Sequence, residues 1–185
     1  PHPLTETAAS MVAAITTVKK AADILFFMCS SPALYLSLTI LSQTARKNNR
    51  FYFISPDELK VPAYTIEDTL KPYNSEYYEV SSLEETLPKL DVLYMTRVQK
   101  ERFFSEDEYL RLKDTYILNR EKLNLAKPDM PVLHPLPRVD EISTDVDDDN
   151  RAAYFKQVQN GKYVRMAVIM ALLEITDPLT GQKVL

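Results

Sequence analysis

The stretch Val92-Leu-Tyr-Met95 is a short apolar run that leads into the polar segment Thr96-Arg-Val-Gln-Lys-Glu-Arg102. Short runs of apolar, β-branched and aromatic residues are typical of buried strands. Four similar runs occur elsewhere in the chain, at Ile24–Met28, Phe51–Ile54, Tyr77–Val80 and Pro131–His134. Segments with helical spacing separate most of them, and this alternation predicts an α/β fold built on a mainly parallel sheet of five strands.

Helices are predicted between these runs from apolar residues at helical spacing and from capping residues. The predicted helices cover residues 5–20, 32–47, 62–72 and 82–87, and Pro88 is expected to stop the last of them. We expect a surface loop with a helical turn at 105–113. A further helix is predicted to begin after Asn160-Gly161, because Val168 and Leu172 belong to an apolar stripe there.

The bulk composition fits a single soluble domain. A length of 185 residues supports one sizeable core, and 45% hydrophobic with 26% charged residues is ordinary for such a chain. A net charge of −4 offers nucleic acid no basic face. The longest apolar run, Ile24–Cys29, is far shorter than the ~20 residues that span a bilayer. No secretory signal opens the sequence, so a cytoplasmic location is expected.

Cysteine, histidine and glycine are scarce, and this scarcity excludes several kinds of site. The single cysteine, Cys29, rules out an internal disulfide, and the two histidines, His2 and His134, are too few for a Cys/His zinc site. The two glycines, Gly161 and Gly181, form no glycine-rich nucleotide loop. We therefore expect neither a metal nor a nucleotide cofactor.

An acidic run lies at Asp145-Val-Asp-Asp-Asp149. Its spacing and its lack of a glycine differ from an EF-hand calcium loop. The run precedes a helix predicted around Ala152–Phe155, where negative charge complements the helix N-terminus. We therefore interpret it as a solvated helix cap.

Two polar loops follow predicted strands, so they meet at the carboxyl edge of a parallel sheet, where ligands gather. One loop carries Arg97 and Gln99, and the other carries Arg138. Two guanidinium groups in one cleft suit a small dicarboxylate, because planar bidentate donors match carboxylate geometry. Gln99 could bind an ammonium or a carboxylate on the same side. The alternative is that Arg97 and residues 100–102 form a solvated charge cluster.

The segment Pro135-Leu-Pro137 forms a stiff loop, because its two prolines lack N–H groups and restrict the backbone. The carbonyls of such a loop can accept hydrogen bonds from an amino group. A plain rigid turn is the other interpretation, and the spacing does not choose between the two.

Two long motifs resemble signature loops of aspartate carbamoyltransferase catalytic chains, and they occur in the same order as in that family. They are Tyr94-Met-Thr-Arg-Val-Gln-Lys-Glu-Arg102 and His134-Pro-Leu-Pro-Arg-Val-Asp-Glu-Ile142. The similarity continues through Phe51–Asp57 and from Ala152 to Arg165. This resemblance implies a three-layer α/β/α, Rossmann-like domain that binds aspartate.

The resemblance also implies roles for individual residues. Arg97 and Gln99 would bind the carboxylates of aspartate, while the carbonyls of Leu136 and Pro137 would hold amino groups of the substrates. A cis bond is implied between Leu136 and Pro137. Arg165 would bridge to the other domain of the family's catalytic chain when the subunit closes.

Four further positions align with functional positions of the family, and one of them carries a different residue. Tyr109 and Asp140 correspond to a pair that positions the loop between residues 102 and 113. His2 corresponds to a histidine that polarises the carbonyl of carbamoyl phosphate. Glu6 stands where the family has a glutamine that holds the amide of that substrate, and its carboxylate should weaken binding of a phosphate-bearing ligand.

The chain differs from the family in two ways that affect the expected activity. The segment Met28–Leu36 lacks the arginine with which the family grips aspartate, so weak aspartate affinity is expected. The family's carbamoyl-phosphate domain, with its Ser-Thr-Arg-Thr loop, lies upstream of everything in this chain. Residues 1–185 are therefore expected to form a single aspartate-binding domain. The implied reaction, in which the aspartate amine attacks carbamoyl phosphate, needs no cofactor, but a lone half should be inactive or weak.

Three interpretations follow for the function. The first is an aspartate carbamoyltransferase domain of pyrimidine biosynthesis, whose family forms homotrimers and leaves room for a regulatory chain. The second is a non-catalytic paralogue or engineered domain that keeps the fold as a binding or assembly module. The third is an ornithine-type carbamoyltransferase, which is less well supported because that family has a cysteine where this chain has Pro135.

Overall fold

The computed structural model of the chain describes residues 23–27, 41, 44–45, 48–96, 107, 116–175 and 181. The chain divides into two compact units, which are treated separately below. Residues 20–154 form the sheet unit, and residues 1–19 with 155–185 form the helix unit.

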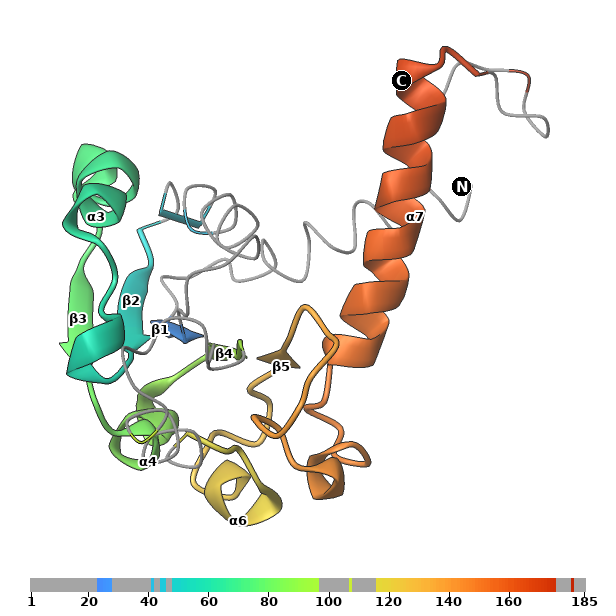
Figure 1. The fold of residues 1–185 in the computed structure, drawn as a ribbon. Helices are drawn as coiled ribbons and strands as arrows, with labels where there is room; N and C mark the ends of the chain where they lie inside the picture. The colour runs from blue at the N-terminus through green and yellow to red at the C-terminus, as the bar shows by residue number, and fades with distance from the viewer. Residues whose placement is uncertain are drawn as a thin grey trace. The chain divides into compact units, whose positions relative to one another are not determined.

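The described strands of the sheet unit pair side by side in the order β3-β2-β1-β4-β5 (Figure 1). All four pairings are parallel. Their registers align Leu25 with Tyr52 on one side and with Leu93 on the other. The predicted parallel α/β arrangement is therefore confirmed. The strands are β1 (Asp23–Phe27), β2 (Arg50–Ile54), β3 (Tyr77–Val80), β4 (Val92–Tyr94) and β5 (Val132–Leu133).

Short helices connect the strands. Two of them, α3 (Ala63–Thr69) and α4 (Leu83–Thr86), lie where helices were predicted, and the Ser82 hydroxyl caps α4 by accepting from the Glu85 N–H at 3.2 Å. The α-helix ends at Thr86, just before Pro88, as expected, and a 3-10 turn with Pro88 in its first turn follows it. The other short elements are α6 (Arg120–Leu123) and the 3-10 turns η1 (Asp57–Leu59), η2 (Lys71–Tyr73), η3 (Leu87–Lys89) and η5 (Thr144–Val146).

Three predicted segments fall wholly or mainly outside the described residues. The helix at 5–20 is one of them. Within 32–47 only Leu41, Thr44 and Ala45 are described, and all three are helical. Within 105–113 only Asp107 is described, and it is helical too.

The core of the sheet unit is apolar and closely packed. Ile54, Leu93 and Val132 come from three different strands and are fully buried in one cluster with side chains of the connecting helices. Burying one such side chain contributes about 1.5–3 kcal/mol. This cluster fixes the sheet, and the sheet in turn fixes where the loop after each strand begins.

The long helix α7 spans Tyr154–Leu172 and runs without a break through Gly161. The prediction of separate helices before and after Asn160-Gly161 was therefore wrong. One glycine inside a helix costs only about 1 kcal/mol relative to alanine, which a 19-residue helix tolerates. Val168 and Leu172 of the predicted apolar stripe are exposed, at 47% and 78%. None of the described helices combines the length and apolarity that a bilayer span requires.

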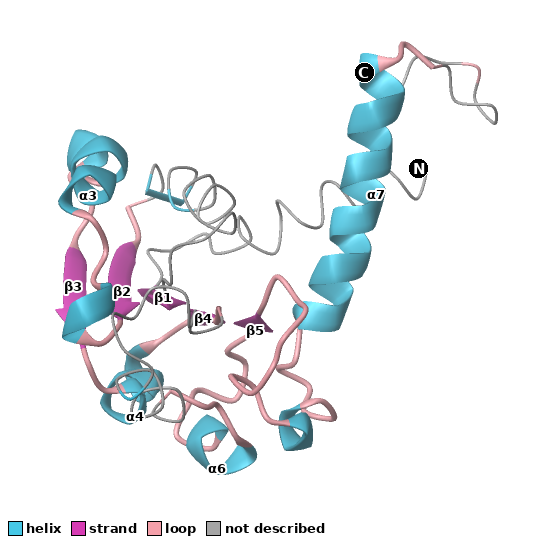
Figure 2. Cartoon of the chain, in the orientation of Figure 1, coloured by secondary structure: helices cyan, strands magenta, loops and turns pink. Residues whose placement is uncertain are grey.

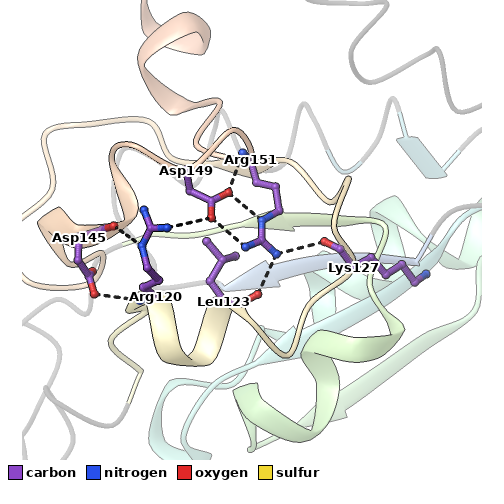
Figure 3. Close-up of polar contacts among 6 residues, drawn as sticks. All are labelled: Arg120, Leu123, Lys127, Asp145, Asp149 and Arg151. Atoms are coloured by element: carbon purple, nitrogen blue, oxygen red, sulfur yellow. Dashed lines mark hydrogen bonds and ion pairs between the residues drawn. The ribbon is translucent and has the colours of Figure 1, made fainter.

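The segment from β5 to α7 is mostly loop, drawn pink in Figure 2, and partly buried polar contacts hold its second half (Figure 3). Arg151 binds Asp149 through two nitrogens, at 2.8 and 2.9 Å, and also donates to the Leu123 carbonyl at 2.9 Å. Arg120 donates its backbone N–H to the Asp145 carboxylate at 3.1 Å. These contacts tie α6 to the loop.

The interpretation of the acidic run as a solvated helix cap was therefore wrong. Arg120, which is 25 residues away, donates its backbone N–H to Asp145, the nearby Arg151 pairs with Asp149, and α7 begins only at Tyr154. Ion pairing with Arg151 lowers the pKa of Asp149 from 3.8 to about 2, against the opposing effect of burial. A carboxylate held in this way stabilises the fold only while it is ionised.

We predict that Asp149→Asn lowers the free energy of unfolding by about 2 kcal/mol at pH 7. Because the folded pKa lies below the unfolded one, the difference from wild type should be complete above about pH 4 and shrink as the pH falls toward 2. Urea unfolding across this range measures it. Asp148→Asn, at the neighbouring exposed carboxylate, is the control. A difference that does not vary with pH, or an equal loss in the control, would contradict the ion-pair account.

Candidate functional site

The carboxyl edge of the sheet determines where a site can form. The chain adds β2 and β3 on one side of β1, and β4 and β5 on the other, so the switch point lies between β1 and β4. In open parallel sheets ligands bind at this point, outside the carboxyl ends of the strands. The loop after β5, residues 134–141, belongs to this edge and is described throughout.

Five of the predicted site residues lie outside the described part of the chain. They are His2, Glu6, Arg97, Gln99 and Tyr109. Their predicted roles stay predictions. Leu136, Pro137, Arg138, Asp140 and Arg165 are described.

The backbone of the loop after β5 is unusual at two neighbouring positions. The Leu136–Pro137 peptide bond is cis, as the resemblance implied. Leu136 has φ +47°, a left-handed conformation that costs a residue with a side chain about 1–2 kcal/mol. Neither the Leu136 carbonyl nor the Pro137 carbonyl accepts a hydrogen bond from another described residue. The loop therefore presents two backbone acceptors that the described fold does not use.

The two ends of this loop are a buried histidine and a buried glutamate. His134 is 1% exposed and Glu141 is 7% exposed, and His134 Nε2 lies 2.8 Å from Glu141 Oε1. The Leu136 N–H donates to His134 Nδ1 at 2.8 Å. Because an N–H can only donate, Nδ1 carries no proton, so the imidazole is neutral and Nε2 is the donor to Glu141.

The second carboxylate oxygen of Glu141 also has backbone partners. Glu141 Oε2 accepts from the N–H of Val139 at 3.0 Å and of Asp140 at 3.1 Å. Burial raises the pKa of Glu141, but hydrogen bonds from His134 and from backbone N–H groups outweigh it and hold the pKa below its ordinary value. Glu141 is therefore a buried, ionised carboxylate with hydrogen bonds to both of its oxygens.

Arg138 is occupied by an acidic residue of its own chain. Both of its terminal nitrogens bind Asp147, with Nη2 2.6 Å from Oδ2, and its guanidinium carbon lies 5.6 Å from the centre of the Tyr154 ring. The Tyr154 hydroxyl donates to Asp147 Oδ1 at 2.5 Å. The expectation that Arg138 offers its guanidinium to a ligand carboxylate needs correction, since Asp147 fills that position.

The charges of this triad reinforce one another. The hydrogen bond from Arg138 holds the pKa of Asp147 below its ordinary value, and Asp147 in turn raises the pKa of Arg138. Burial, helped by the neighbouring carboxylate, raises the pKa of Tyr154 to about 12. All three groups therefore keep one charge state over the range in which enzymes work, and the triad serves as a fixed support for the loop.

Two other predicted residues have local partners among the described residues. Asp140 is exposed, and the Tyr109 that should pair with it is outside the described residues. Arg165 lies exposed on α7 and donates Nε to the Gly161 carbonyl one turn earlier at 3.2 Å. Its side chain therefore lies along its own helix.

A separate hollow of about 290 Å³ lies at the carboxyl ends of β2 and β3. Its lining has both signs of charge, and its Lys60 already pairs with Asp57 at 2.9 Å. The hollow contains none of the predicted site residues and lies away from the switch point. Its position and mixed charge do not favour a ligand site. In the part of the chain that is described, no group of three His, Cys, Asp or Glu residues could hold a metal ion.

The supporting residues of the loop were missed at the level of sequence. Glu141 and Tyr154 lie within the motifs quoted above, yet no role was inferred for them. Asp147 was assigned to a solvated run. One available signal was the sequence proximity of His134 and Glu141, which places an acceptor and a donor at the two ends of a proline-restricted loop.

Comparison with known proteins gives a consistent family. Residues 32–172 match the family described as aspartate/ornithine carbamoyltransferase, Asp/Orn binding domain. The aspartate carbamoyltransferase catalytic subunit of Clostridium botulinum (strain Eklund 17B / Type B) is 57% identical over 136 residues, which is 74% of this chain and 44% of that protein. The catalytic subunit of Clostridium acetobutylicum is 48% identical over 176 residues, or 94% of this chain and 57% of that protein.

Solved structures agree. The catalytic subunit of M. jannaschii aspartate transcarbamoylase superposes with a TM-score of 0.75 at 37% identity, covering 91% of this chain and 56% of that one. Aspartate transcarbamoylase from Trypanosoma cruzi, in complex with N-(phosphonacetyl)-L-aspartic acid, gives 0.71 at 29% identity, covering 91% and 55%. The chain thus spans about half the length of the relatives that it matches.

We predict that Tyr154→Phe lowers the free energy of unfolding by about 1 kcal/mol, the contribution of one buried hydrogen bond. The phenylalanine keeps the ring beneath Arg138 but removes the hydroxyl that binds Asp147. Tyr64→Phe, at a tyrosine that is 56% exposed, is the matched control and should change stability by less than about 0.5 kcal/mol. Equal effects in urea unfolding would argue against the triad as a support.

Proposed function

The chain belongs to the aspartate/ornithine carbamoyltransferase family, and from this premise we propose that it is the aspartate-binding half of an aspartate carbamoyltransferase catalytic chain. The reaction of the whole protein would transfer the carbamoyl group of carbamoyl phosphate to the amine of L-aspartate, a step of pyrimidine biosynthesis. The observation that carries the proposal is the loop after β5, whose Leu136 and Pro137 carbonyls accept no hydrogen bond from another described residue.

The loop suits the chemistry of an amino group. The carbonyls of Leu136 and Pro137 would accept hydrogen bonds from the substrate amino groups, and a carbonyl that is already fixed in direction needs no reorganisation when the ligand binds. Arg97 and Gln99, which follow β4 at the same edge, would bind the carboxylates of aspartate.

Relatives bind ligands of this kind. The Trypanosoma cruzi enzyme is described in complex with aspartate and phosphate, and with carbamoyl phosphate. By analogy, His2 would act on carbamoyl phosphate, with Glu6 close to it. Arg165 would bridge to the phosphate-binding half, and Tyr109 would pair with Asp140.

The same proposal covers the domain architecture, the assembly and the activity of the chain. We infer that residues 1–185 correspond to one three-layer α/β/α aspartate-binding domain and that the carbamoyl-phosphate domain belongs to another part of the whole protein. A homotrimer in the cytoplasm, with or without a regulatory chain, is the corresponding assembly. Acting without its phosphate-binding half, the chain should be inactive or only weakly active, because orientation of both substrates supplies most of the acceleration.

We predict that calorimetric titration with N-(phosphonacetyl)-L-aspartic acid gives a measurable heat with the wild-type chain. Arg97→Ala should weaken binding about tenfold or more, because a charge-assisted hydrogen bond to a carboxylate contributes about 1.5–3 kcal/mol.

The control is Arg50→Ala, which removes the same charge at the start of β2, on the opposite edge of the sheet. Its affinity should stay within about twofold of wild type, because it lies far from the carboxyl edge. Absence of heat with the wild type would contradict the binding site and favour a non-catalytic paralogue. Equal weakening by both substitutions would show a general charge effect.

A further inference from the structure

We propose that His134 and Glu141 act together as positioning residues that aim the Leu136 and Pro137 carbonyls at the ligand, an inference that rests on the proposed function. Neither side chain would touch the substrate. Both would act through backbone N–H groups on either side of the two carbonyls.

The first step concerns which peptide groups the pair controls. The Leu136 N–H belongs to the peptide group before residue 136, and the Val139 N–H belongs to the one before residue 139. Between them lie the peptide groups that carry the Leu136 and Pro137 carbonyls. His134 fixes the plane of the peptide group before residue 136, and Glu141 fixes the plane of the peptide group before residue 139. The pair therefore brackets the two acceptors.

The second step concerns energy. Leu136 occupies a left-handed conformation that a leucine rarely adopts, so a local interaction must offset its cost. The 2.8 Å bond from its N–H to His134 Nδ1 lies at this residue. Loss of this bond would leave the Leu136 N–H without its acceptor, which is costly away from water. Without it, the loop should relax and turn the carbonyls away.

The third step concerns the protonation state. The bond from Leu136 fixes Nδ1 as an acceptor, and the Glu141 carboxylate fixes Nε2 as the donor. An imidazole with both positions occupied has one tautomer and one ring orientation. The other carboxylate oxygen of Glu141 accepts hydrogen bonds from the backbone N–H groups of Val139 and Asp140, at the far end of the loop. The pair therefore links both ends of the loop through hydrogen bonds.

The tautomer can be measured without any ligand, because the chain has only two histidines. Nitrogen-15 NMR of the imidazole groups at pH 7 should show one ring protonated at Nε2 and bare at Nδ1, and this signal should vanish in His134→Gln. A ring at position 134 that is protonated at Nδ1, or at both nitrogens, would overturn the proposal.

Binding of N-(phosphonacetyl)-L-aspartic acid then tests positioning with three variants. His134→Gln keeps a donor that reaches toward Glu141 but offers Leu136 no acceptor. His134→Asn keeps an acceptor near the position of Nδ1 but does not reach Glu141. Glu141→Gln keeps the shape but cannot accept from His134 and from the backbone N–H groups simultaneously. We expect His134→Gln and Glu141→Gln to weaken binding about tenfold or more, and His134→Asn to recover part of the loss.

The structural control is Arg151→Gln, which breaks the partly buried ion pair with Asp149 elsewhere in the same unit. Its affinity should stay within about twofold of wild type even where its urea midpoint falls as far as theirs. Wild-type affinity in folded His134→Gln and Glu141→Gln would overturn the positioning role alone. Affinity that follows the unfolding midpoint across all four variants would overturn it as well. A wild-type chain that shows the expected tautomer but gives no heat would instead overturn the proposed function, and the ligand role with it.

Discussion

Parallel pairing of the strands is the constraint on which the rest of the sheet unit depends. A strand that pairs in parallel with its predecessor requires the chain to cross back over the sheet, so every loop that follows a strand leaves from the same edge. Among the described strands β1 comes first, β2 and β3 follow on one side of it, and β4 and β5 lie on its other side. The segments after β4 and β5 therefore begin as neighbours, although about forty residues separate them in the sequence.

A loop at such an edge must be rigid without support from a strand ladder, and here buried polar groups supply that support. His134 and Glu141 satisfy backbone N–H groups from inside the loop. Arg138, Asp147 and Tyr154 hold its outer end, and Arg151 with Asp149 holds the segment that follows. Buried charges are costly unless they are fully paired, and each of these carboxylates has at least two donors. The loop is thus positioned by polar contacts on a scaffold that apolar packing determines.

Sequence patterns predicted the strands well because each strand is a local feature. Val92–Tyr94 is apolar along its whole length, and a fully buried parallel strand requires this. Patterns failed where the outcome depended on distant partners. Asp145 binds Arg120, twenty-five residues away, and nothing near the acidic run indicates this. Gly161 failed as a helix boundary because a single glycine costs less than a long helix gains. The motif His134–Ile142 identified the family, but the contact between His134 and Glu141 becomes apparent only in the folded structure.

The distribution of arginines sharpens the proposed function. Two arginines were expected at the carboxyl edge, yet Asp147 binds both terminal nitrogens of Arg138. The segment 28–36 contains no arginine at all. On the proposed function, Arg97 is then the remaining guanidinium among the predicted aspartate ligands of this chain. One guanidinium and two carbonyls can orient a small dicarboxylic amino acid, but they leave one of its carboxylates without an arginine. On that proposal, a cation for this carboxylate would come from residues other than Arg97 and Arg138.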